Sequence, residues 1–348
     1  MNAFRVFVRK AISMAAAMII FISCAHFRED AVQEKSPQSS STERIYSNPV
    51  LDGNFPDPFV LRAGDGYHLY ATNGTLGNIQ HAFSRDLVNW RISGDVLPIL
   101  PVWAKGGLTW APEVIEINDR YLMYYTLRDK ATNVQCISVA SSDKPEGPFV
   151  DLSTRPFINQ PEIGGSIDAS PFRDTDGSLY LYWKNDGNAL GMFTTIYAQK
   201  LSPDGFVLQG ERRELMMNDR LWEGNVVEAP TMHEEGGYYY LLYSASDYAS
   251  DLYGVGYAVG PSPMGPFKKS PSNPLIASMG AVAGPGHQCI VKDAAGTDWL
   301  VYHAWTAPHI GDAEGVRSAR IDPIVFSDGK ITFEGPSEDL RSAPVGLR

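Results

Sequence analysis

The chain has 348 residues, of which 44% are hydrophobic and 11% aromatic, and its formal net charge is −11. The hydrophobic content is sufficient for a globular core, and the length allows one large domain or two ordinary ones. The acidic balance argues against nucleic acid or an anionic membrane surface as a partner, and three cysteines are too few for a disulfide framework, whereas a neutral polysaccharide remains compatible with the charge.

Residues 1–23 predict an export signal. Arg5, Arg9 and Lys10 precede an apolar run that ends near Cys24 and is too short for a comfortable membrane span. The tetrapeptide "FISC" resembles a bacterial lipobox, whose cysteine is lipidated after cleavage, although Phe21 stands where leucine is usual. We therefore expect an exported bacterial protein that is periplasmic or anchored to the outer membrane through a lipid on Cys24.

Residues 24–46 are polar, serine-rich and aperiodic, which is typical of a flexible tether. The remaining residues, 47–348, are expected to form one folded domain. Cys136 and Cys289 lie in apolar, strand-like runs without metal-ligand spacing, so we expect two buried free thiols.

Beyond residue 46, five segments share one layout. Each begins at a proline, continues as a strand, turns on polar or glycine residues and returns as a second strand rich in aromatic residues. The prolines are Pro58, Pro112, Pro171, Pro230 and Pro285. A further strand follows each hairpin, and a period of roughly 50 to 60 residues holding about four strands is typical of a β-propeller rather than a β-sandwich. The sequence predicts an all-β, five-bladed β-propeller.

Acidic residues stand at three of the five strand entrances: Asp57, Asp168 and Glu228. Trp110 occupies the second entrance, and the fifth is a glycine-rich stretch that leads to His287. The first strand of each propeller blade lines the central channel, so these side chains should converge at one face. A single acid there would be an ordinary turn cap, but three unpartnered acids repel one another and therefore indicate a functional site. We also expect Pro58 to hold Asp57 in an extended conformation.

The ordered set of motifs resembles the family 43 glycoside hydrolases, five-bladed propellers that act on polysaccharides containing arabinose and xylose. The resemblance covers about Asn48 to Pro336 and rests on "NPVLDGNFPDP", "WAP", "SIDASPF", "VVEAP" and "GPGHQ".

This resemblance implies that Asp57 is the general base, Glu228 the general acid, and Asp168 the residue that tunes the pKa of the acid and orients the substrate. Inverting hydrolysis needs one carboxylate to activate water and a protonated acid on the opposite side, roughly 6.5–9.5 Å away. A third carboxylate raises the pKa of the acid by charge repulsion, which keeps the acid protonated near neutral pH.

The same resemblance implies three substrate-binding residues. Trp110 would offer a flat face to a sugar ring, or else pack between blades. His287 matches a family histidine on the channel floor near a calcium ion or a water, with a neutral core histidine as the alternative. Arg317 falls close to a family arginine, although Val316 replaces the glycine that usually precedes it. No cofactor is required, and a structural Ca²⁺ near the axis is the one metal that the resemblance suggests.

The function implied is an inverting glycosidase that releases pentose from plant cell-wall glycans, either an α-L-arabinofuranosidase or an arabinanase. The alternatives are a β-xylosidase acting on xylo-oligosaccharides or arabinoxylan, and a non-catalytic carbohydrate-binding propeller, which the presence of all three carboxylates disfavours. The chain ends soon after the fifth blade, without the C-terminal β-sandwich of many family xylosidases, and this favours arabinose. The stretch "NDGNALGMFTTI" is expected to wall one end of the funnel and to favour exo action. We expect a monomer whose partner is a neutral pentose-containing glycan.

The lipid anchor is tested by Cys24→Ser. The variant should move from the membrane fraction to the soluble fraction with unchanged activity, because residues 25–45 serve only as a tether. Fractionation together with mass spectrometry of the mature N-terminus measures both. A wild-type protein that is soluble and begins at another residue contradicts lipidation but not export.

Overall fold

The computed structural model describes residues 44–347. The predicted signal peptide, Cys24 and the tether up to residue 43 lie outside the described residues. Ile45 and Tyr46, which the sequence analysis assigned to the tether, instead form strand β1 (Ile45–Tyr46) of the folded domain. No helix within residues 44–347 is long and apolar enough to cross a membrane.

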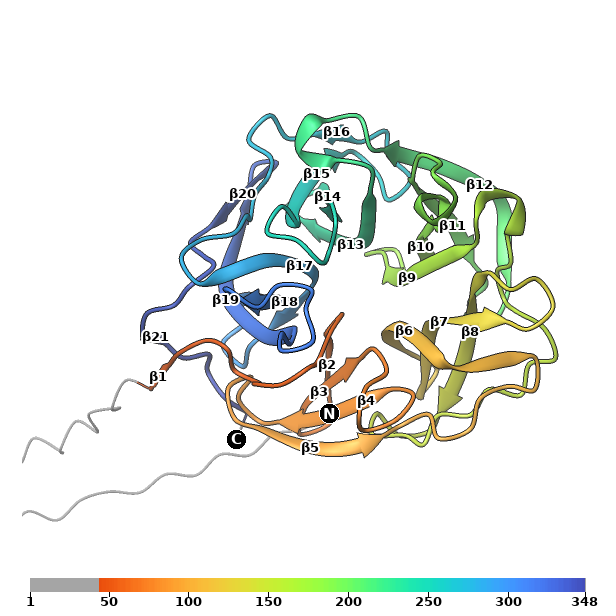
Figure 1. Ribbon diagram of the computed structural model, residues 1–348, viewed down its shortest axis with the longest axis horizontal. Helices are drawn as coiled ribbons and strands as arrows, with labels where there is room; N and C mark the ends of the chain where they lie inside the picture. The colour runs from red at the N-terminus through yellow and green to blue at the C-terminus, as the bar shows by residue number, and fades with distance from the viewer. Residues whose placement is uncertain (1–43, 348) are drawn as a thin grey trace, which may run out of the picture. The chain divides into compact units, whose positions relative to one another are not determined.

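Five antiparallel sheets of three or four strands are arranged around a central axis, and a sixth sheet of two strands joins the ends of the described domain. This arrangement confirms the predicted five-bladed propeller (Figure 1). Blade 1 contains β2 (Phe59–Ala63), β3 (Gly66–Ala71), β4 (Gln80–Ser84) and β5 (Trp90–Asp95). Blade 2 contains β6 (Ala104–Ile117), β7 (Arg120–Asp129) and β8 (Gln135–Ser142). Blade 3 contains β9 (Ser166–Arg173), β10 (Leu179–Asn185), β11 (Thr195–Leu201) and β12 (Leu208–Met217).

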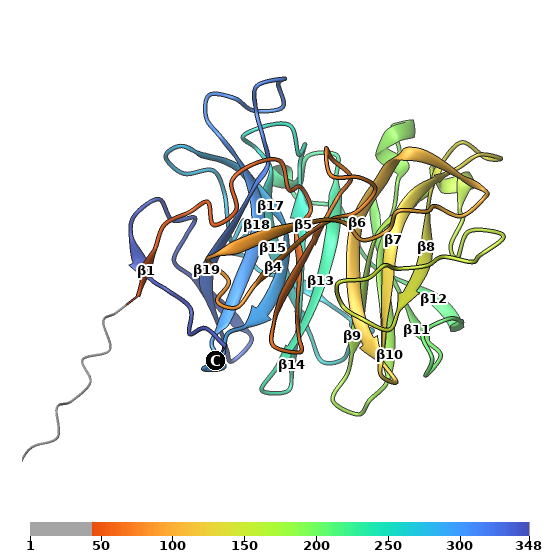
Figure 2. The same ribbon diagram turned by 90° about the horizontal axis from the view of Figure 1, so that it is seen from below.

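Blade 4 contains β13 (Val227–Glu235), β14 (Tyr238–Ala245), β15 (Gly254–Gly260) and β16 (Lys268–Lys269). Blade 5 contains β17 (Val282–Lys292), β18 (Asp298–Thr306), β19 (Ser318–Ser327) and β20 (Lys330–Phe333). Three short 3₁₀ helices occur in the described loops: η1 (Pro161–Ile163), η2 (Gly187–Leu190) and η3 (Leu221–Glu223). Seen from the side, the strands run between the two faces of the ring, where the connecting loops lie (Figure 2).

Local sequence explains the hairpins within the blades. The turns at Asn118–Asp119 and Gly236–Gly237 have positive φ at both residues, the geometry that fits the right-handed twist of a two-residue hairpin and that Asn, Asp and Gly tolerate best. The middle strands are buried on both faces, as in β3, because each blade packs against two neighbours.

Blade 2 differs from the expected four strands. Its outermost position is filled only by isolated pairings of Val150 with Ser141 and of Ile158 with Ile137. Pro145, Pro148 and Pro156 flank these pairings, and proline has no N–H with which to extend a sheet. The outer edge of this blade is therefore a loop held at two points.

The hydrophobic core of the described residues is divided into five clusters, one between each pair of adjacent blades. Leu69 and Val301, for example, belong to the cluster between blades 1 and 5. Cys136 and Cys289 are buried free thiols, as predicted.

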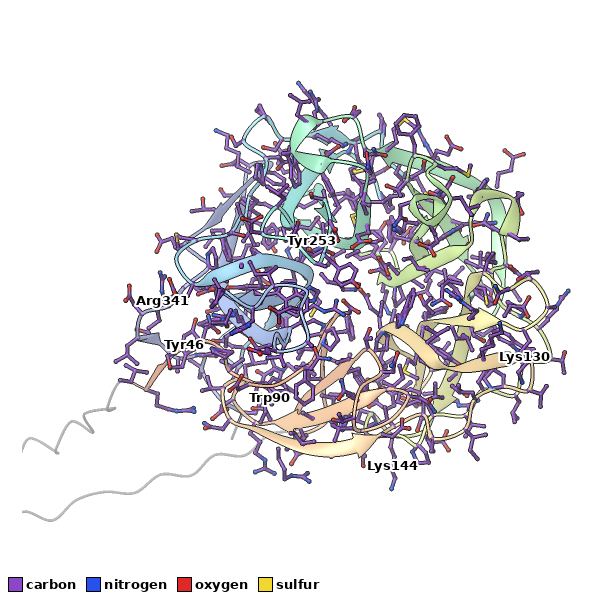
Figure 3. The ribbon with its side chains drawn as sticks, in the orientation of Figure 1. Tyr46, Trp90, Lys130, Lys144, Tyr253 and Arg341 are labelled. Atoms are coloured by element: carbon purple, nitrogen blue, oxygen red, sulfur yellow. The ribbon has the colours of Figure 1, made fainter. Side chains whose placement is uncertain are left out.

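The ring is closed by the two ends of the domain. Strand β1 pairs with β21 (Arg341–Ser342), and Figure 3 shows Tyr46 and Arg341 side by side at this junction. The Asn48 side chain donates to the carbonyl of Ile321 (2.8 Å) and accepts from the N–H of the same residue (3.0 Å). Leu51 continues the contact by pairing with Ala319 of blade 5. The N-terminal segment thus fastens blade 1 to blade 5.

Candidate active site

Each innermost strand has, or begins just after, one non-glycine residue with left-handed backbone geometry at the same place in its blade. These residues are Asp57 (φ 56°), Ala111 (46°), Asp168 (58°), Ala229 (49°) and His287 (49°). In blades 2 to 5 the pairing register between the first two strands shifts at this point, which marks a β-bulge. Such a conformation costs on the order of 1–3 kcal/mol per residue and persists only where the surroundings impose it.

Side chains of the preceding blade satisfy the N–H groups that four of these bulges expose. The N–H of Ala111 donates to Thr72 Oγ1 (2.9 Å), that of Asp168 to Thr126 Oγ1 (3.2 Å), and that of His287 to Ser244 Oγ (2.8 Å). The N–H of Asp57 donates to His303 Nδ1 (3.0 Å), across the closure between blades 5 and 1. In blade 3 the corresponding position is Lys184, which has no acceptor, and the N–H of Ala229 donates to Asp168 Oδ2 instead (3.0 Å).

This geometry corrects one prediction. The expectation that Pro58 holds Asp57 in an extended conformation is wrong, because φ of Asp57 is 56°. The hydrogen bond to His303 Nδ1 fixes the left-handed backbone, which aspartate adopts more readily than most residues. Asp57 and Asp168 are bulge residues, whereas Trp110 and Glu228 each precede one, so the three acids are not strictly equivalent.

The three acids nevertheless line one cavity of about 360 Å³ at the mouth of the central channel. All six residues predicted for the site line it: Asp57, Trp110, Asp168, Glu228, His287 and Arg317. The remaining walls are formed by Thr72, Arg128, Ile167, Lys184, Asp186, Asn188, Ala189, Tyr248 and Tyr253. Figure 3 shows Tyr253 on the inner side of the ring.

Asp57 is surrounded by groups that favour its ionised form. Its Oδ1 lies 3.0 Å from Arg317 Nη1 and 3.3 Å from His287 Nδ1, and the Thr72 hydroxyl donates to its Oδ2. Burial alone would raise the pKa of Asp57, but the charge of Arg317, followed by His287 and the Thr72 hydrogen bond, holds it well below its usual range. Asp57 is therefore a carboxylate at neutral pH and well into the acidic range.

His303 completes this side of the site. Burial, followed by the nearby charge of Arg317, holds its pKa well below the usual value, so the ring is neutral. Its Nδ1 accepts the Asp57 N–H, which places the ring proton on Nε2.

A second group of side chains in the cavity, around Glu228, carries more negative charge. Glu228 Oε1 accepts from the Tyr253 hydroxyl (2.7 Å), and its Oε2 accepts from Lys184 Nζ (3.1 Å). Burial raises the pKa of Asp168 to about 6; the nearby charge of Glu228 also raises it, whereas His287 and Lys184 lower it. Asp168 thus gains and loses a proton close to neutral pH, while Asp57 does not.

Arg317 is committed to Asp57 and to the cavity wall. Its guanidinium lies 4.8 Å from the Tyr248 ring centroid and 5.9 Å from that of Trp305, in addition to its ion pair with Asp57. Trp110 is half-buried and pairs with Thr126 of β7, so it is available to the cavity on one side.

The Ca²⁺ that the family resemblance suggests near His287 stays a prediction. The neighbours of His287 include the Asp57 carboxylate, which is paired with Arg317, the His303 imidazole and the Asp168 carboxyl group. Elsewhere in the described chain, His233, Glu235 and Asp298 each place one ligand atom within 4.8 Å of the others. Lys292 Nζ already lies 2.7 Å from Asp298 Oδ2, and the group sits at the opposite end of β13 from Glu228.

The sequence analysis missed several residues that shape the site, chiefly Lys184, Tyr253, Thr72 and His303. Thr72 directly follows the second strand of blade 1, and Lys184 and His303 lie near the end of the second strands of blades 3 and 5, a register position that the repeat could have revealed. Tyr253 comes from the loop before β15 and carries no comparable sequence signal.

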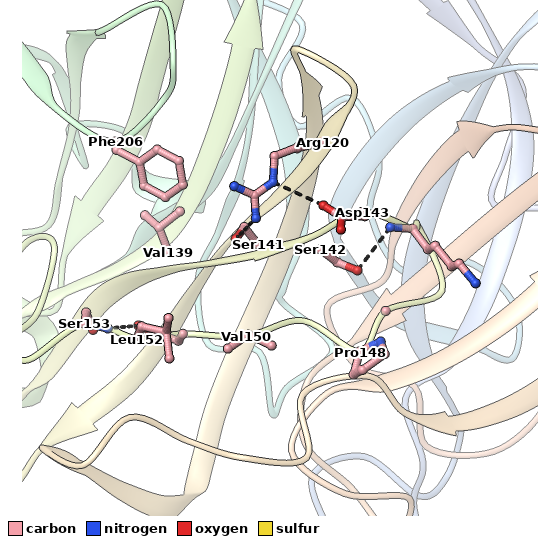
Figure 4. A pocket seen from close by; sticks show the side chains of 13 residues that line it. Arg120, Val139, Ser141, Ser142, Asp143, Pro148, Val150, Leu152, Ser153 and Phe206 are labelled. Carbon is pink, nitrogen blue, oxygen red and sulfur yellow. Dashed lines mark hydrogen bonds and ion pairs between the residues drawn. The ribbon is translucent and has the colours of Figure 1, made fainter.

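A larger depression of about 670 Å³ lies at the loop-like outer edge of blade 2 (Figure 4). Its two acids are already engaged: Asp143 pairs with Arg120 (3.3 Å), and Asp151 accepts from the hydroxyls of Tyr125 (2.7 Å) and Ser138 (2.5 Å). It has no pair of opposed carboxylates and therefore lacks the chemistry of the central cavity.

Comparison with known proteins agrees with this geometry. Residues 46–331 match the family described as glycosyl hydrolases family 43. A crystal structure of a thermostable family-43 glycoside hydrolase superimposes with a TM-score of 0.79 and 33% sequence identity, covering 86% of this chain and 99% of that one. Beta-D-galactofuranosidase xynD of Aspergillus niger is 28% identical over 83% of this chain and 86% of its own length.

Several other curated relatives are longer. The chain is 27% identical to the beta-xylosidase of Bacillus subtilis over 79% of its own length but spans only 52% of that relative. The family match, the propeller and the carboxylates that meet in its central cavity lead to one conclusion: the chain belongs to glycosyl hydrolases family 43 and is a glycosidase.

Proposed function

We propose that this glycosidase is an exported protein and acts as an inverting, exo-acting α-L-arabinofuranosidase. The observation that carries the proposal is the presence, within one cavity, of a carboxylate held ionised at Asp57 and of a cluster around Glu228 whose member Asp168 has a pKa of about 6. Two carboxyl groups with separated proton affinities are what acid–base glycoside hydrolysis requires.

Asp57 is the general base in this proposal. An ionised carboxylate can accept a proton from water as the water attacks the anomeric carbon, so that no covalent sugar–enzyme bond forms. Thr72 occupies Oδ2 and Arg317 lies at Oδ1, so the carboxylate cannot rotate away from the cavity.

Glu228 is the general acid, and Asp168 is its tuning partner. Glu228 has the longer side chain and is 14% exposed in the cavity, whereas Asp168 is buried. The glutamate is thus the carboxyl group better able to reach the departing oxygen. Asp168 has a pKa of about 6, and in its ionised form its negative charge favours the protonated form of Glu228.

The cavity favours a terminal sugar. A volume of about 360 Å³ is near the lower end of the roughly 300–1,000 Å³ of ligand pockets. Asp186, Asn188 and Ala189, from the stretch that the sequence analysis singled out, form one wall, and η2 lies in this loop. Such a wall supports exo action.

Similarity to a galactofuranosidase supports a furanoside substrate, because β-D-galactofuranose has the ring configuration of α-L-arabinofuranose with one more exocyclic carbon. A β-xylosidase is the second candidate, and the similarity to the Bacillus subtilis beta-xylosidase favours it.

Product analysis tests the proposed substrate. Linear arabinan, arabinoxylan and xylo-oligosaccharides should yield free arabinose from the first two and no xylose from the third, without early arabino-oligosaccharides. Proton NMR of the first product should show the inverted anomer. Xylose as the main product supports the second candidate, early oligosaccharides contradict exo action, and retention contradicts Asp57 as base.

The two carboxyl roles are separated by leaving-group dependence. Glu228→Gln should lose most activity on glycans but keep much of it on an aryl glycoside with a low-pKa phenol, because such a leaving group needs no proton. Asp57→Asn should lose about 10²-fold or more on both substrates, because both require an activated water. If Glu228→Gln loses activity equally on both substrates, Glu228 is not the general acid, and Asp168 becomes the candidate for that role.

The charge of Arg317 should set the acidic limit of activity. Arg317→Gln removes the positive charge that most lowers the pKa of Asp57, so that pKa should rise and the acidic limb of the kcat/KM profile should move to higher pH. Arg212→Gln is the matched control, because Arg212 stacks on Tyr197 (4.3 Å) outside the cavity, and its profile should not move. An unmoved acidic limb in a folded Arg317→Gln variant contradicts the assignment of Asp57 as the ionised base.

A further inference from the structure

Lys184 breaks the pattern of side chains that cap the bulges. At the corresponding position the other four blades carry Thr72, Thr126, Ser244 and His303, each accepting a main-chain N–H of the next blade. An ammonium can only donate, so blade 3 gives up this bond and Asp168 supplies the acceptor. The lysine is also 0% exposed, which is costly for a charge unless its partners compensate.

The partners of Lys184 all belong to the acid side of the site. Its Nζ lies 3.1 Å from Glu228 Oε2 and 2.9 Å from Asn188 Oδ1. Burial opposes the charge, but the carboxylates of Glu228, Asp168 and Asp186 together raise the pKa of Lys184, so it stays charged. One buried cation therefore faces three carboxylates.

The same contacts fix the orientation of Glu228. Lys184 Nζ donates to Oε2, and the Tyr253 hydroxyl donates to Oε1 at 2.7 Å. One carboxyl oxygen is therefore held from blade 3 and the other from the loop before β15 of blade 4. The ionisable and charged groups around this carboxyl are Asp168 on β9, Lys184 on β10, Asp186 after β10, Tyr253 before β15 and His287 on β17. Arg128 of β7 lies beyond, next to Asp186.

We propose that Lys184 is a positioning residue of this glycosidase: it orients Glu228 and sets the pH at which the acid-side carboxyl groups lose their shared proton. The inference rests on the proposed acid role of Glu228. The interaction of Lys184 with its neighbouring carboxyl groups then sets the alkaline limit of activity, and no single acid sets it alone.

The sign of the effect follows from the charges. Lys184 lowers the pKa of Asp168, and loss of a positive charge within about 4–6 Å of a carboxylate raises its pKa by roughly 1–3 units. Removing the lysine should therefore keep the proton on the acid side to higher pH. Removing the negative charge of Asp168 should move the limb the other way.

The test uses two substitutions. Lys184→Met keeps the length of the side chain without its charge. Lys184→Thr introduces the hydroxyl that blades 1 and 2 carry at this position, and so adds an acceptor for the Ala229 N–H. In both, the alkaline limb of kcat/KM should move up by about one pH unit or more. The kcat for glycans should fall about tenfold, because the general acid is misplaced but still present, whereas a complete general acid contributes a rate factor of roughly 10²–10⁴. The fall should be smaller for an aryl glycoside with a good leaving group.

Lys269→Met is the matched control. Lys269 is also a buried lysine (7% exposed), paired with the fully buried Glu223 at 2.7 Å, but it does not line the cavity. Its loss should lower thermal stability without moving the pH profile. A folded Lys184→Thr or Lys184→Met variant whose alkaline limb stays in place overturns the proposal, as does an equal shift in Lys269→Met.

A second measurement makes the result independent of the substrate. Carbon-13 NMR titration of the Asp168 carboxyl should show its midpoint, about 6 in the wild type, at higher pH in Lys184→Thr. If neither pentose glycan is hydrolysed but this midpoint moves, the proposed function fails while the electrostatic role of Lys184 stands. If the midpoint is unchanged, the Lys184 proposal fails whatever the enzyme hydrolyses.

Discussion

The active site depends on the main-chain N–H groups of five residues with left-handed backbone geometry, four of which lie at β-bulges. A bulge turns one residue of the innermost strand out of the sheet register, and its N–H then lacks a partner within its own blade. Leaving such a group buried and unpaired would cost roughly 1–3 kcal/mol, so each N–H is satisfied by a side chain, mostly of the preceding blade. These bonds hold the left-handed backbone in place, and that backbone brings Asp57 and Asp168 to the axis.

Because the bonds cross blade boundaries, the base also depends on ring closure. His303, which accepts the Asp57 N–H, and Arg317, which pairs with its carboxylate, both belong to the last blade or the loop before its third strand. Blade 5 is fastened to blade 1 by the N-terminal segment, through the amide of Asn48 on Ile321 and the pairing of Leu51 with Ala319. By joining blade 5 to blade 1, the N-terminal segment thus helps to keep His303 and Arg317 beside Asp57, where they favour its ionised form.

The charges in the cavity are distributed unevenly, and this unevenness is what makes it suited to acid–base chemistry. Asp57 faces a guanidinium, an imidazole and a hydroxyl donor, which together outweigh its burial. On the other side, one ammonium serves Glu228, Asp168 and Asp186, and burial keeps the pKa of Asp168 near 6. Similar carboxyl groups a short distance apart therefore differ in proton affinity because of what each blade contributes around them. The departure of blade 3 from the capping pattern, with Lys184 in place of a hydroxyl, moderates this difference, because the ammonium lowers the pKa of Asp168.

The sequence by itself determined the number of blades and the identity of the acids. The repeat can be recognised from turn residues, aromatic strands and the prolines at the strand entrances, because each of these features depends only on residues close together in the sequence. It also assigned Asp57, Asp168, Glu228, Trp110, His287 and Arg317 to one site, and all six line the same cavity. Tertiary structure decided the rest. The left-handed backbone of Asp57 follows from an acceptor 246 residues away, and no local preference of an Asp–Pro pair could indicate it. Lys184, Tyr253 and His303 carry ordinary local signals and acquire their roles only where the blades meet, because charge and hydrogen-bond partnership are set by distances between elements that are remote in the chain.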